Sequence, residues 1–111
     1  MRRVSWVRAA WKEFGSFPQA VQERMKFALE IAAAGETADI AKAMKGFDVG
    51  VFELALAYRS DAYRTVYAVR LGQDIWILHA FKKKSTQGIK TPKREIDVIH
   101  ERIKRIRELL T

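Results

Sequence analysis

The sequence predicts an α+β fold in which N-terminal helices pack on a twisted antiparallel sheet and a further helix ends the chain. Three patterns support this prediction. Apolar residues recur at helical spacing over residues 19–34, whereas residues 51–82 hold three runs rich in Val, Ile, Tyr, Phe and Trp. A helical stripe of isoleucines follows Thr91-Pro92 near the C-terminus. At 111 residues, the chain is expected to form a single domain over residues 1–111.

The N-terminal segment predicts a strand and then helices. Val4–Trp6 could open the chain as a short strand, and the apolar residues of 7–14 recur at helical spacing. Gly15 breaks this pattern, after which Pro18 suits the first turn of a new helix. Gly35 is placed to end that helix as a C-terminal cap. The core-facing stripe of this helix is expected to consist of Val21, Met25, Ala28, Leu29 and Ala32.

The middle of the chain changes to strand periodicity. A short helix is expected from Thr37 to Met44, before Gly46 stops it. Residues 51–58, 63–71 and 74–82 are then predicted to form three strands. Their connections are short, and since parallel neighbours need a long crossover, the strands should form an antiparallel meander. The turn residues between them are Ser60-Asp61 and Gly72-Gln73.

The second turn suggests a register for the last two strands. If Leu71 pairs with Asp74, Arg64 lies opposite Phe81. A one-residue bulge would undo this pairing. Because side chains alternate along a strand, the register puts two sets on one face: Arg64, Val66, Ala68 and Arg70 on one strand, and Ile75, Ile77, His79 and Phe81 on the next.

The C-terminal helix has clear start signals. Thr91 is expected to cap it, with Pro92 at the first helical position. Its apolar stripe is Ile96, Ile99, Ile103, Ile106 and Leu110. Three bases near its end suit the negative end of the helix dipole, and so have a structural explanation: Lys104, Arg105 and Arg107. Bases on the sheet and in the loop 82–90 are therefore the better functional candidates.

The charge of the chain predicts an anionic partner. Lys plus Arg number 21 and Asp plus Glu 13, which gives a net charge of +8. Residues 81–111 hold ten bases and four acids, so 10 − 4 = +6 of that charge lies there. Such a field attracts nucleic acid, although a solvated surface tuned for solubility is the alternative. The chain has no cysteine, no apolar run long enough to span a membrane and no signal peptide, so a cytoplasmic location is expected.

Residues 63–97 carry a long and specific motif. A strand of the form aromatic-Arg-x-Val-Tyr begins at Tyr63, a second ends in His-Ala-Phe-Lys-Lys-Lys-Ser at residues 79–85, and Thr91-Pro92 opens a helix. Further matching residues upstream are Trp6, Phe17-Pro18 and Lys45-Gly46-Phe47. On this motif the chain is identified as a member of the RelE/ParE toxin superfamily, and it resembles the phage-derived, HigB-like branch of type II toxin–antitoxin systems.

The resemblance implies a RelE-like fold and a toxin with two partners. One partner is a cognate antitoxin, usually a helix-turn-helix protein that covers the basic surface of the toxin. The other is mRNA on the ribosome, which RelE-like relatives cleave in the A site without a metal, leaving a cyclic phosphate. The sequence departs from the pattern at Ala55, where many members have an arginine, so one potential phosphate contact is missing. It also has Lys82 where this branch often has Gln.

Cleavage of RNA by its own 2′-hydroxyl requires a base, an acid and cations that stabilise the phosphorane. No metal or other cofactor is required if Arg and Lys supply the positive charge. Arg64 matches the strand arginine of the family pattern, and its guanidinium can hold two phosphate oxygens at once. The structural alternative is an ordinary cross-strand partner for Glu53 or Asp61. Glu53 could also act as the base, although a single strand glutamate is a weak signal.

The remaining candidate catalytic residues are Lys82, Lys83, Lys84 and His79. Packed lysines lower one another's pKa, but lysines at the end of an edge strand also discourage aggregation. An imidazole can shuttle protons near neutral pH, but on an apolar strand it is more often a hydrogen-bonded core residue. The candidate RNA-binding residues are Arg59, Arg70, Lys90 and Lys93. Aromatic residues that could stack on bases, or lie in the core, are Tyr58, Tyr63, Tyr67 and Trp76.

Three functional hypotheses therefore remain. The first is a ribosome-dependent mRNA endoribonuclease. The second is a ParE-like toxin that binds DNA gyrase without cutting RNA, since one fold serves both activities. The third is a toxin fold that has become a non-catalytic binding module, for which Ala55 is the only support in the sequence. Arg64 together with Lys82–Lys84 favours RNA cleavage, because a gyrase inhibitor has no need of a phosphate-cleaving centre.

Overall fold

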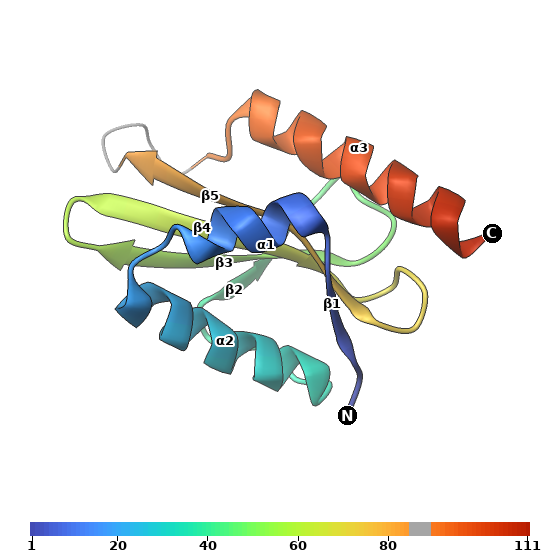
Figure 1. Cartoon of the computed structure of the whole chain (residues 1–111), viewed down its shortest axis with the longest axis horizontal. Coiled ribbons are helices and arrows are strands. Elements are labelled where there is room, and N and C mark those ends of the chain that lie inside the picture. Colours follow the sequence, from blue (N-terminus) through green and yellow to red (C-terminus); the bar gives the residue numbers. More distant parts are fainter. Residues whose placement is uncertain (85–89) are drawn as a thin grey trace.

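A computed structural model describes residues 1–84 and 90–111. Within these residues the chain forms three helices and one five-stranded sheet with the order β1-β5-β4-β3-β2 (Figure 1). The elements are β1 Val4–Trp6, α1 Arg8–Gly15, α2 Gln19–Ala33, β2 Ala41–Ala43, β3 Val51–Tyr58, β4 Asp61–Ala68, β5 Ile75–Lys84 and α3 Lys93–Leu110. The predicted α+β class, with a helix at the C-terminal end, is confirmed. In this part of the chain no helix combines the length and apolar character that a membrane span requires.

The sheet separates two apolar layers, with α1 and α2 on one face and α3 on the other (Figure 1). The first layer includes Phe14, Met25, Leu54, Tyr67 and Ile77. The second includes Val66, Leu78, Ile99, Ile103 and Ile106. The predicted stripe of α2 is in the core, as are Ile99, Ile103 and Ile106 of the α3 stripe. The two ends of the α3 stripe are not: Ile96 is half-buried and Leu110 is 51% exposed. Because both faces are covered, the strands of the middle of the sheet bury side chains on both sides.

The N-terminal strand pairs in a direction that the sequence did not predict. Val4–Trp6 forms a strand as expected, but it runs parallel to Ile75–Ile77. The sheet is therefore mixed: its meander is antiparallel as predicted, and β1 adds a parallel edge strand that the predicted antiparallel sheet did not include. A parallel pair needs a long crossover, and here α1, α2 and the first strands of the meander lie between the two partners.

The predicted short helix from Thr37 to Met44 is also wrong. Ala41–Ala43 forms β2, which pairs antiparallel with β3 at the edge of the sheet. The Met44 amide donates to the Val51 carbonyl at 2.8 Å, and the Ala55 amide donates to the Ile40 carbonyl at 3.0 Å. Ala, Lys and Met favour a helix, but the unpaired edge of β3 offers this segment partners outside its own sequence, and this tertiary pairing overrides the local preference.

The helix starts lie one residue away from their predicted positions. Pro18 and Pro92 each stand just before the first helical residue. Thr91 does not cap α3 as predicted, because its hydroxyl donates to Glu53 Oε2 at 2.9 Å instead. Gly35 ends α2 as predicted, with φ at +89° and its amide donating to the Ala32 carbonyl at 3.0 Å.

The antiparallel meander is confirmed, and its register is correct only in part. Arg64 pairs with Phe81, as predicted, but the register shifts by one between Val66 and Tyr67. Leu78 is the extra residue on β5, since its two neighbours both have partners on β4. The prediction therefore fails between the bulge and the β4–β5 turn: Ile75 and Ile77 face the α1 and α2 layer, whereas Leu78 and Phe81 face α3. Arg70 lies after the end of β4.

We predict that Gly50→Ala lowers the free energy of unfolding by about 1–3 kcal/mol. Gly50 has φ at +64°, and an added Cβ would lie 2.8 Å from Val69 Cγ2. Urea unfolding measures the effect. Gly15→Ala is the matched control, because nothing lies within 4 Å of the added Cβ and alanine favours the helix end. Equal stability of the two variants would contradict the prediction.

Candidate functional site

Most of the candidate residues gather at one end of the sheet. The β3–β4 turn, the end of β5 and the start of α3 lie together there (Figure 1). We call this region the basic end; its candidate residues are Arg59, Arg64, Lys82, Lys83, Lys84, Lys90 and Lys93. Arg70 is not part of it, because it follows β4 at the opposite end of that strand. The structure thus brings together residues that are up to 34 positions apart in the chain.

Arg64 lies at the centre of the basic end and is only 8% exposed. Its Nη1 donates to Glu53 Oε1 at 2.6 Å, and the Thr91 hydroxyl donates to the other oxygen of the same carboxylate. The cross-strand pairing with Glu53, which was the structural alternative, is therefore present. Arg64 Nε is buried without a hydrogen-bond partner in the described structure. One edge of the guanidinium thus retains a donor that is not satisfied, which is unusual for a buried polar group.

Lys83 lies on the same face of the sheet as Arg64 and is 3% exposed. Its ammonium donates to the Lys90 carbonyl at 2.5 Å. Burial and then the charge of Arg64 lower the pKa of Lys83, while Glu53 opposes this shift. Lys82 points to the other face, where it is exposed and lies 3.8 Å from Asp61.

The predicted effect of packed lysines therefore has a different physical origin. Lys82 and Lys83 point to opposite faces of the sheet. The pKa of Lys83 is therefore lowered by burial and by the charge of Arg64, and not by a neighbouring lysine. Lys84 is the last residue of β5 and pairs with Asp61 in the sheet register, but its side chain lies outside the described structure. The rest of the loop between Lys84 and Lys90 also lies outside it.

These residues form what we call the Arg64 cluster: Glu53, Arg64, Lys83 and Thr91. Two cations and one carboxylate give it a formal charge of 2 − 1 = +1. Ala55 lies directly opposite Arg64 in the register and is exposed, so the sheet beside the guanidinium carries no large side chain at that position. A buried arginine beside a lysine with a lowered pKa can hold an anion and exchange a proton with it.

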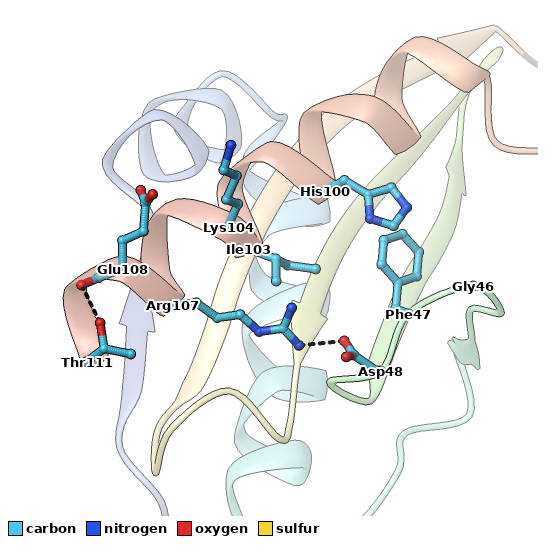
Figure 2. Close-up of a pocket in the computed structure, with 9 residues that line it drawn as sticks. All are labelled: Gly46, Phe47, Asp48, His100, Ile103, Lys104, Arg107, Glu108 and Thr111. Atoms are coloured by element: carbon cyan, nitrogen blue, oxygen red, sulfur yellow. Dashed lines mark hydrogen bonds and ion pairs between the residues drawn. The ribbon is translucent and has the colours of Figure 1, made fainter.

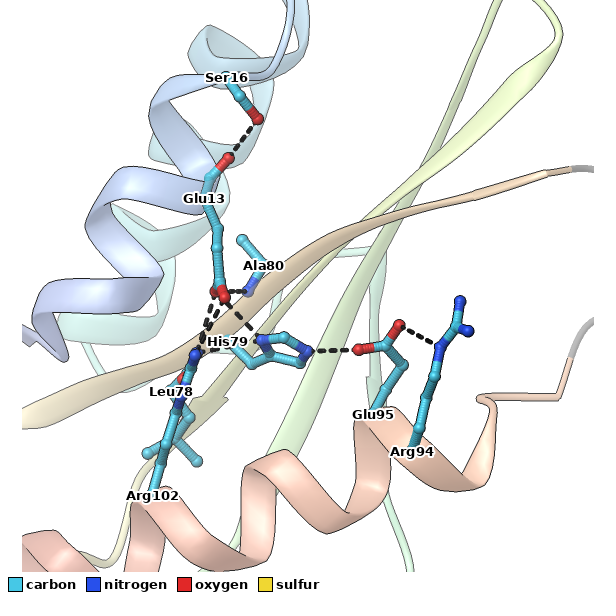
Figure 3. Close-up of polar contacts among 8 residues, drawn as sticks. All are labelled: Glu13, Ser16, Leu78, His79, Ala80, Arg94, Glu95 and Arg102. Atoms are coloured by element: carbon cyan, nitrogen blue, oxygen red, sulfur yellow. Dashed lines mark hydrogen bonds and ion pairs between the residues drawn. The ribbon is translucent and has the colours of Figure 1, made fainter.

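His79 belongs to a different group of polar side chains, which we call the His79 network: Glu13, His79, Glu95 and Arg102 (Figure 3). His79 is 4% exposed and lies between α1 and α3. Its Nδ1 is 3.1 Å from Glu13 Oε1, and its Nε2 is 2.7 Å from Glu95 Oε1. Arg102 donates two hydrogen bonds to Glu13, at 2.9 and 3.0 Å. The core position offered as the alternative for His79 is the one that the geometry matches.

Sequence reasoning missed the other three members of the network. Glu13, Glu95 and Arg102 come from two helices, and each reads as an ordinary surface residue of an amphipathic helix. A weak signal was available: Glu13 and Arg102 both fall next to apolar residues of predicted helices. Nothing in the sequence shows that the two helices approach the same point of β5.

The candidate RNA-binding residues differ in their surroundings. Arg59 is exposed in the β3–β4 turn, with φ at +58° and its guanidinium 5.3 Å from the centre of the Tyr58 ring. Lys90 and Lys93 are exposed beside the start of α3, and Lys93 Nζ lies 3.0 Å from Asp97. The turn contains Arg59 and Ser60, one residue earlier than predicted.

The aromatic candidates for base stacking lie mostly in the core. Tyr63 and Tyr67 are buried among residues of the first layer. Trp76 is half-buried against the second layer, and Tyr58 is half-buried under Arg59. The core alternative therefore holds for Tyr63 and Tyr67.

A large surface groove lies away from the Arg64 cluster. It has a volume of about 620 Å³ and runs between the loop that holds Phe47 and the C-terminal half of α3 (Figure 2). Phe47 stacks on His100 with ring centres 4.4 Å apart, and Asp48 pairs with Arg107 at 2.5 Å. None of the candidate residues lines it. Residues 1–84 and 90–111 contain no group of three or more His, Cys, Asp or Glu side chains placed to hold a metal ion.

The pKa of Glu13 yields a prediction about acid stability. Burial alone would raise this pKa, but hydrogen bonds from His79, Arg102 and the Ala80 amide lower it from 4.5 to about 2. Because the folded value lies below the ordinary one, the stabilisation is present above pH 4.5 and is lost as the pH falls towards 2. The side chain is 29% exposed, so solvent screening reduces the contribution to about 1–2 kcal/mol.

Urea unfolding at about pH 6 and about pH 3 tests this prediction. The loss of stability on acidification should be smaller in Glu13→Gln than in the wild type. Glu30→Gln removes an exposed carboxylate of α2 and should keep the wild-type loss. An unchanged loss in Glu13→Gln would show that another group dominates the acid response.

Comparisons with known proteins identify a family for this sequence and a solved structure with a similar fold. The family model described as Phage derived protein Gp49-like (DUF891) matches residues 12–104. Among solved structures, the isolated E. coli RelE toxin matches with a TM-score of 0.59 at 20% identity, covering 96% of this chain and 99% of that chain. No curated protein matches the sequence. The predicted RelE-like fold and the phage-derived family are thereby confirmed: the chain belongs to the phage-derived Gp49-like family and has the fold of the RelE toxin.

Proposed function

We propose that the protein is the toxin of a type II toxin–antitoxin system and that it cleaves mRNA on the ribosome. The observation that carries the proposal is the buried Arg64 guanidinium, with an unsatisfied Nε, beside Lys83. A phosphate is a ligand that such a guanidinium edge suits. Membership of the Gp49-like family and the RelE fold agree with this proposal.

In the proposed reaction the 2′-oxygen attacks phosphorus and the bond to the 5′-oxygen breaks, which leaves a cyclic phosphate. A base takes the 2′ proton and an acid gives a proton to the leaving 5′-oxygen. Arg64 holds the non-bridging oxygens as negative charge develops on them. Lys83, whose pKa is lowered, is the best placed group to transfer a proton. No step requires a metal or another cofactor.

The exposed cations of the basic end are proposed to guide the RNA. The backbone of Arg59 supports this role. Its left-handed conformation costs about 1–2 kcal/mol for any residue with a β-carbon, and a glycine would avoid this cost. Its guanidinium, exposed over Tyr58, gives a reason for an arginine at that position. The further exposed guiding residues are Lys82, Lys90 and Lys93. Lys84 is proposed to join them, although its side chain lies outside the described structure. Arg70 lies at the far end of β4 and is left out of this group.

The proposed partners are mRNA on the ribosome and a cognate antitoxin, a helix-turn-helix protein. The proposed location is the cytoplasm. An antitoxin that covers the basic end would compete with RNA for the same cations. A ParE-like toxin that binds DNA gyrase is the second hypothesis from the sequence. No contact in the described residues favours it over RNA cleavage, so it serves as an outcome of the test.

We predict that Arg64→Ala lowers the rate of mRNA cleavage about 100-fold or more, because the group that stabilises the phosphorane is lost. Cleavage of a defined message in a purified translation system, mapped by primer extension, measures this rate. Arg70→Ala removes an exposed arginine outside the basic end and should keep the wild-type rate. Arg64→Lys keeps a positive charge near Glu53 but loses the planar guanidinium, which can donate two hydrogen bonds to a phosphate at once. This variant should therefore also cleave slowly.

Two results would count against the proposal. An intact message with folded wild-type protein, free of antitoxin, would exclude the nuclease and would lead to a gyrase supercoiling assay. Equal cleavage by the wild type and by both Arg64 variants, each shown to be folded by its thermal transition, would remove Arg64 from the site.

A further inference from the structure

We propose that His79 is a positioning residue, which fixes the start of α3 through Glu95 and thereby places Lys90 and Thr91 on the Arg64 cluster. The effect on cleavage rests on the proposed function, whereas the effect on α3 does not. The role differs from that of the proton shuttle suggested by the sequence, because His79 acts here through other residues and is buried away from solvent.

The first step concerns the protons of the imidazole. Glu95 is an acceptor whose side chain is only 14% exposed, and His79 Nε2 lies 2.7 Å from its Oε1. A carboxylate cannot donate, so Nε2 carries the proton. The other nitrogen, Nδ1, can donate to Glu13 or accept from Arg102 Nη1, which is 3.1 Å away. The bond from Nε2 to Glu95 is therefore present in both the neutral and the charged imidazole.

The second step concerns the start of α3. Glu95 is the third residue of this helix, and Pro92 before it provides no side-chain cap. The Glu95 and Ile96 amides donate to the Pro92 carbonyl, at 3.0 and 3.2 Å. Arg94 also approaches Glu95, at 3.5 Å, but it is 83% exposed and contributes little there. The hydrogen bond from His79 is thus the main polar anchor of the first turn among the described contacts.

The third step joins this turn to the Arg64 cluster. Within six residues, the chain makes three contacts with the sheet: Lys90 with Lys83, Thr91 with Glu53, and Glu95 with His79. The Lys90 carbonyl and the Thr91 hydroxyl orient Lys83 and Glu53, and Glu53 in turn holds Arg64. Release of Glu95 from His79 would free the C-terminal end of the segment 90–95. The contacts of Lys90 with Lys83 and of Thr91 with Glu53 would then loosen.

The bulge explains how His79 reaches both helices. Leu78 has no partner on β4, and its carbonyl accepts a hydrogen bond from Arg102 Nη1 at 2.9 Å. Arg102 also binds Glu13, so one guanidinium of α3 joins the bulge to α1. The charged groups that face His79 are thus Glu13 from α1, and Glu95 and Arg102 from α3. Together they hold the imidazole in one orientation, with Nε2 directed at the start of α3 (Figure 3).

Two substitutions separate positioning from proton transfer. His79→Gln places an amide nitrogen near the position of Nε2 and can still donate to Glu95. His79→Asn is shorter, so its amide lies near the position of Nδ1 and cannot reach Glu95. Neither amide titrates, so a proton shuttle would be lost in both variants alike. Glu101→Gln is the control on α3, because Glu101 is exposed and pairs with Arg105 one turn along.

We expect His79→Asn to lower kcat for mRNA cleavage about 10- to 100-fold, with KM within about twofold, because the exposed guiding cations are unchanged. His79→Gln should stay within about threefold of the wild type in both constants. Hydrogen exchange gives a readout without catalysis: the Glu95 and Ile96 amides should lose protection in His79→Asn and keep it in His79→Gln and Glu101→Gln.

The outcomes distinguish the alternatives. Equal loss of cleavage in both His79 variants, with wild-type protection of the two amides, would assign proton transfer to His79 and overturn the positioning role. Wild-type protection in His79→Asn would overturn it even if cleavage were normal. If the wild type cleaves no message, the proposed function fails, and the exchange comparison alone still decides whether His79 fixes the start of α3.

Discussion

The one-residue bulge at Leu78 is the constraint on which the rest of the structure depends. Before the bulge, β5 directs Ile75 and Ile77 to the layer under α1 and α2. After it, Phe81 and Lys83 face α3 together with Arg64. Without the extra residue, alternation would exchange the faces of one half of the strand, and either the isoleucines or the Arg64 cluster would be on the wrong side. The bulge therefore allows one strand to complete an apolar core and also to build a polar site.

A sheet covered on both faces imposes a second requirement on this site. Charged groups under α3 lose water, so they must find partners within the protein. Glu53 meets this requirement for Arg64, and the Lys90 carbonyl meets it for Lys83. Removal of one partner from such a buried pair costs about 3–5 kcal/mol, so the same contacts that arrange the site also stabilise the fold. A substitution in the Arg64 cluster is thus expected to change both the arrangement of the site and the stability of the fold.

Whether a feature of the fold or the site was predictable depends on how far apart in the sequence the residues that form it lie. The meander and the stripes of α2 and α3 follow from local periodicity and short turns. The predicted register matches at Arg64 and Phe81 but not next to the turn, because the bulge shifts it by one residue. The β2 strand and the parallel β1 strand do not follow from local periodicity, because each depends on a sheet edge far away in the sequence. The Arg64 cluster was predicted through Arg64 and Lys83, but its member Thr91 was assigned to a cap. Of the His79 network only His79 was a candidate, because its three partners come from two helices whose approach to β5 the sequence does not show.

The pairing of Glu53 limits how Arg64 can bind an anion. One carboxylate oxygen accepts from Arg64 and the other accepts from Thr91, so Glu53 is held from two sides. A phosphate that displaced this carboxylate would leave it buried without its cation, which is costly. The edge of the guanidinium that carries Nε makes no such contact among the described residues. A phosphate that approaches this edge gains a donor that is otherwise unsatisfied and leaves the pair with Glu53 intact. Glu53 thus orients the guanidinium, and in the proposed function the phosphate binds at the edge that carries Nε.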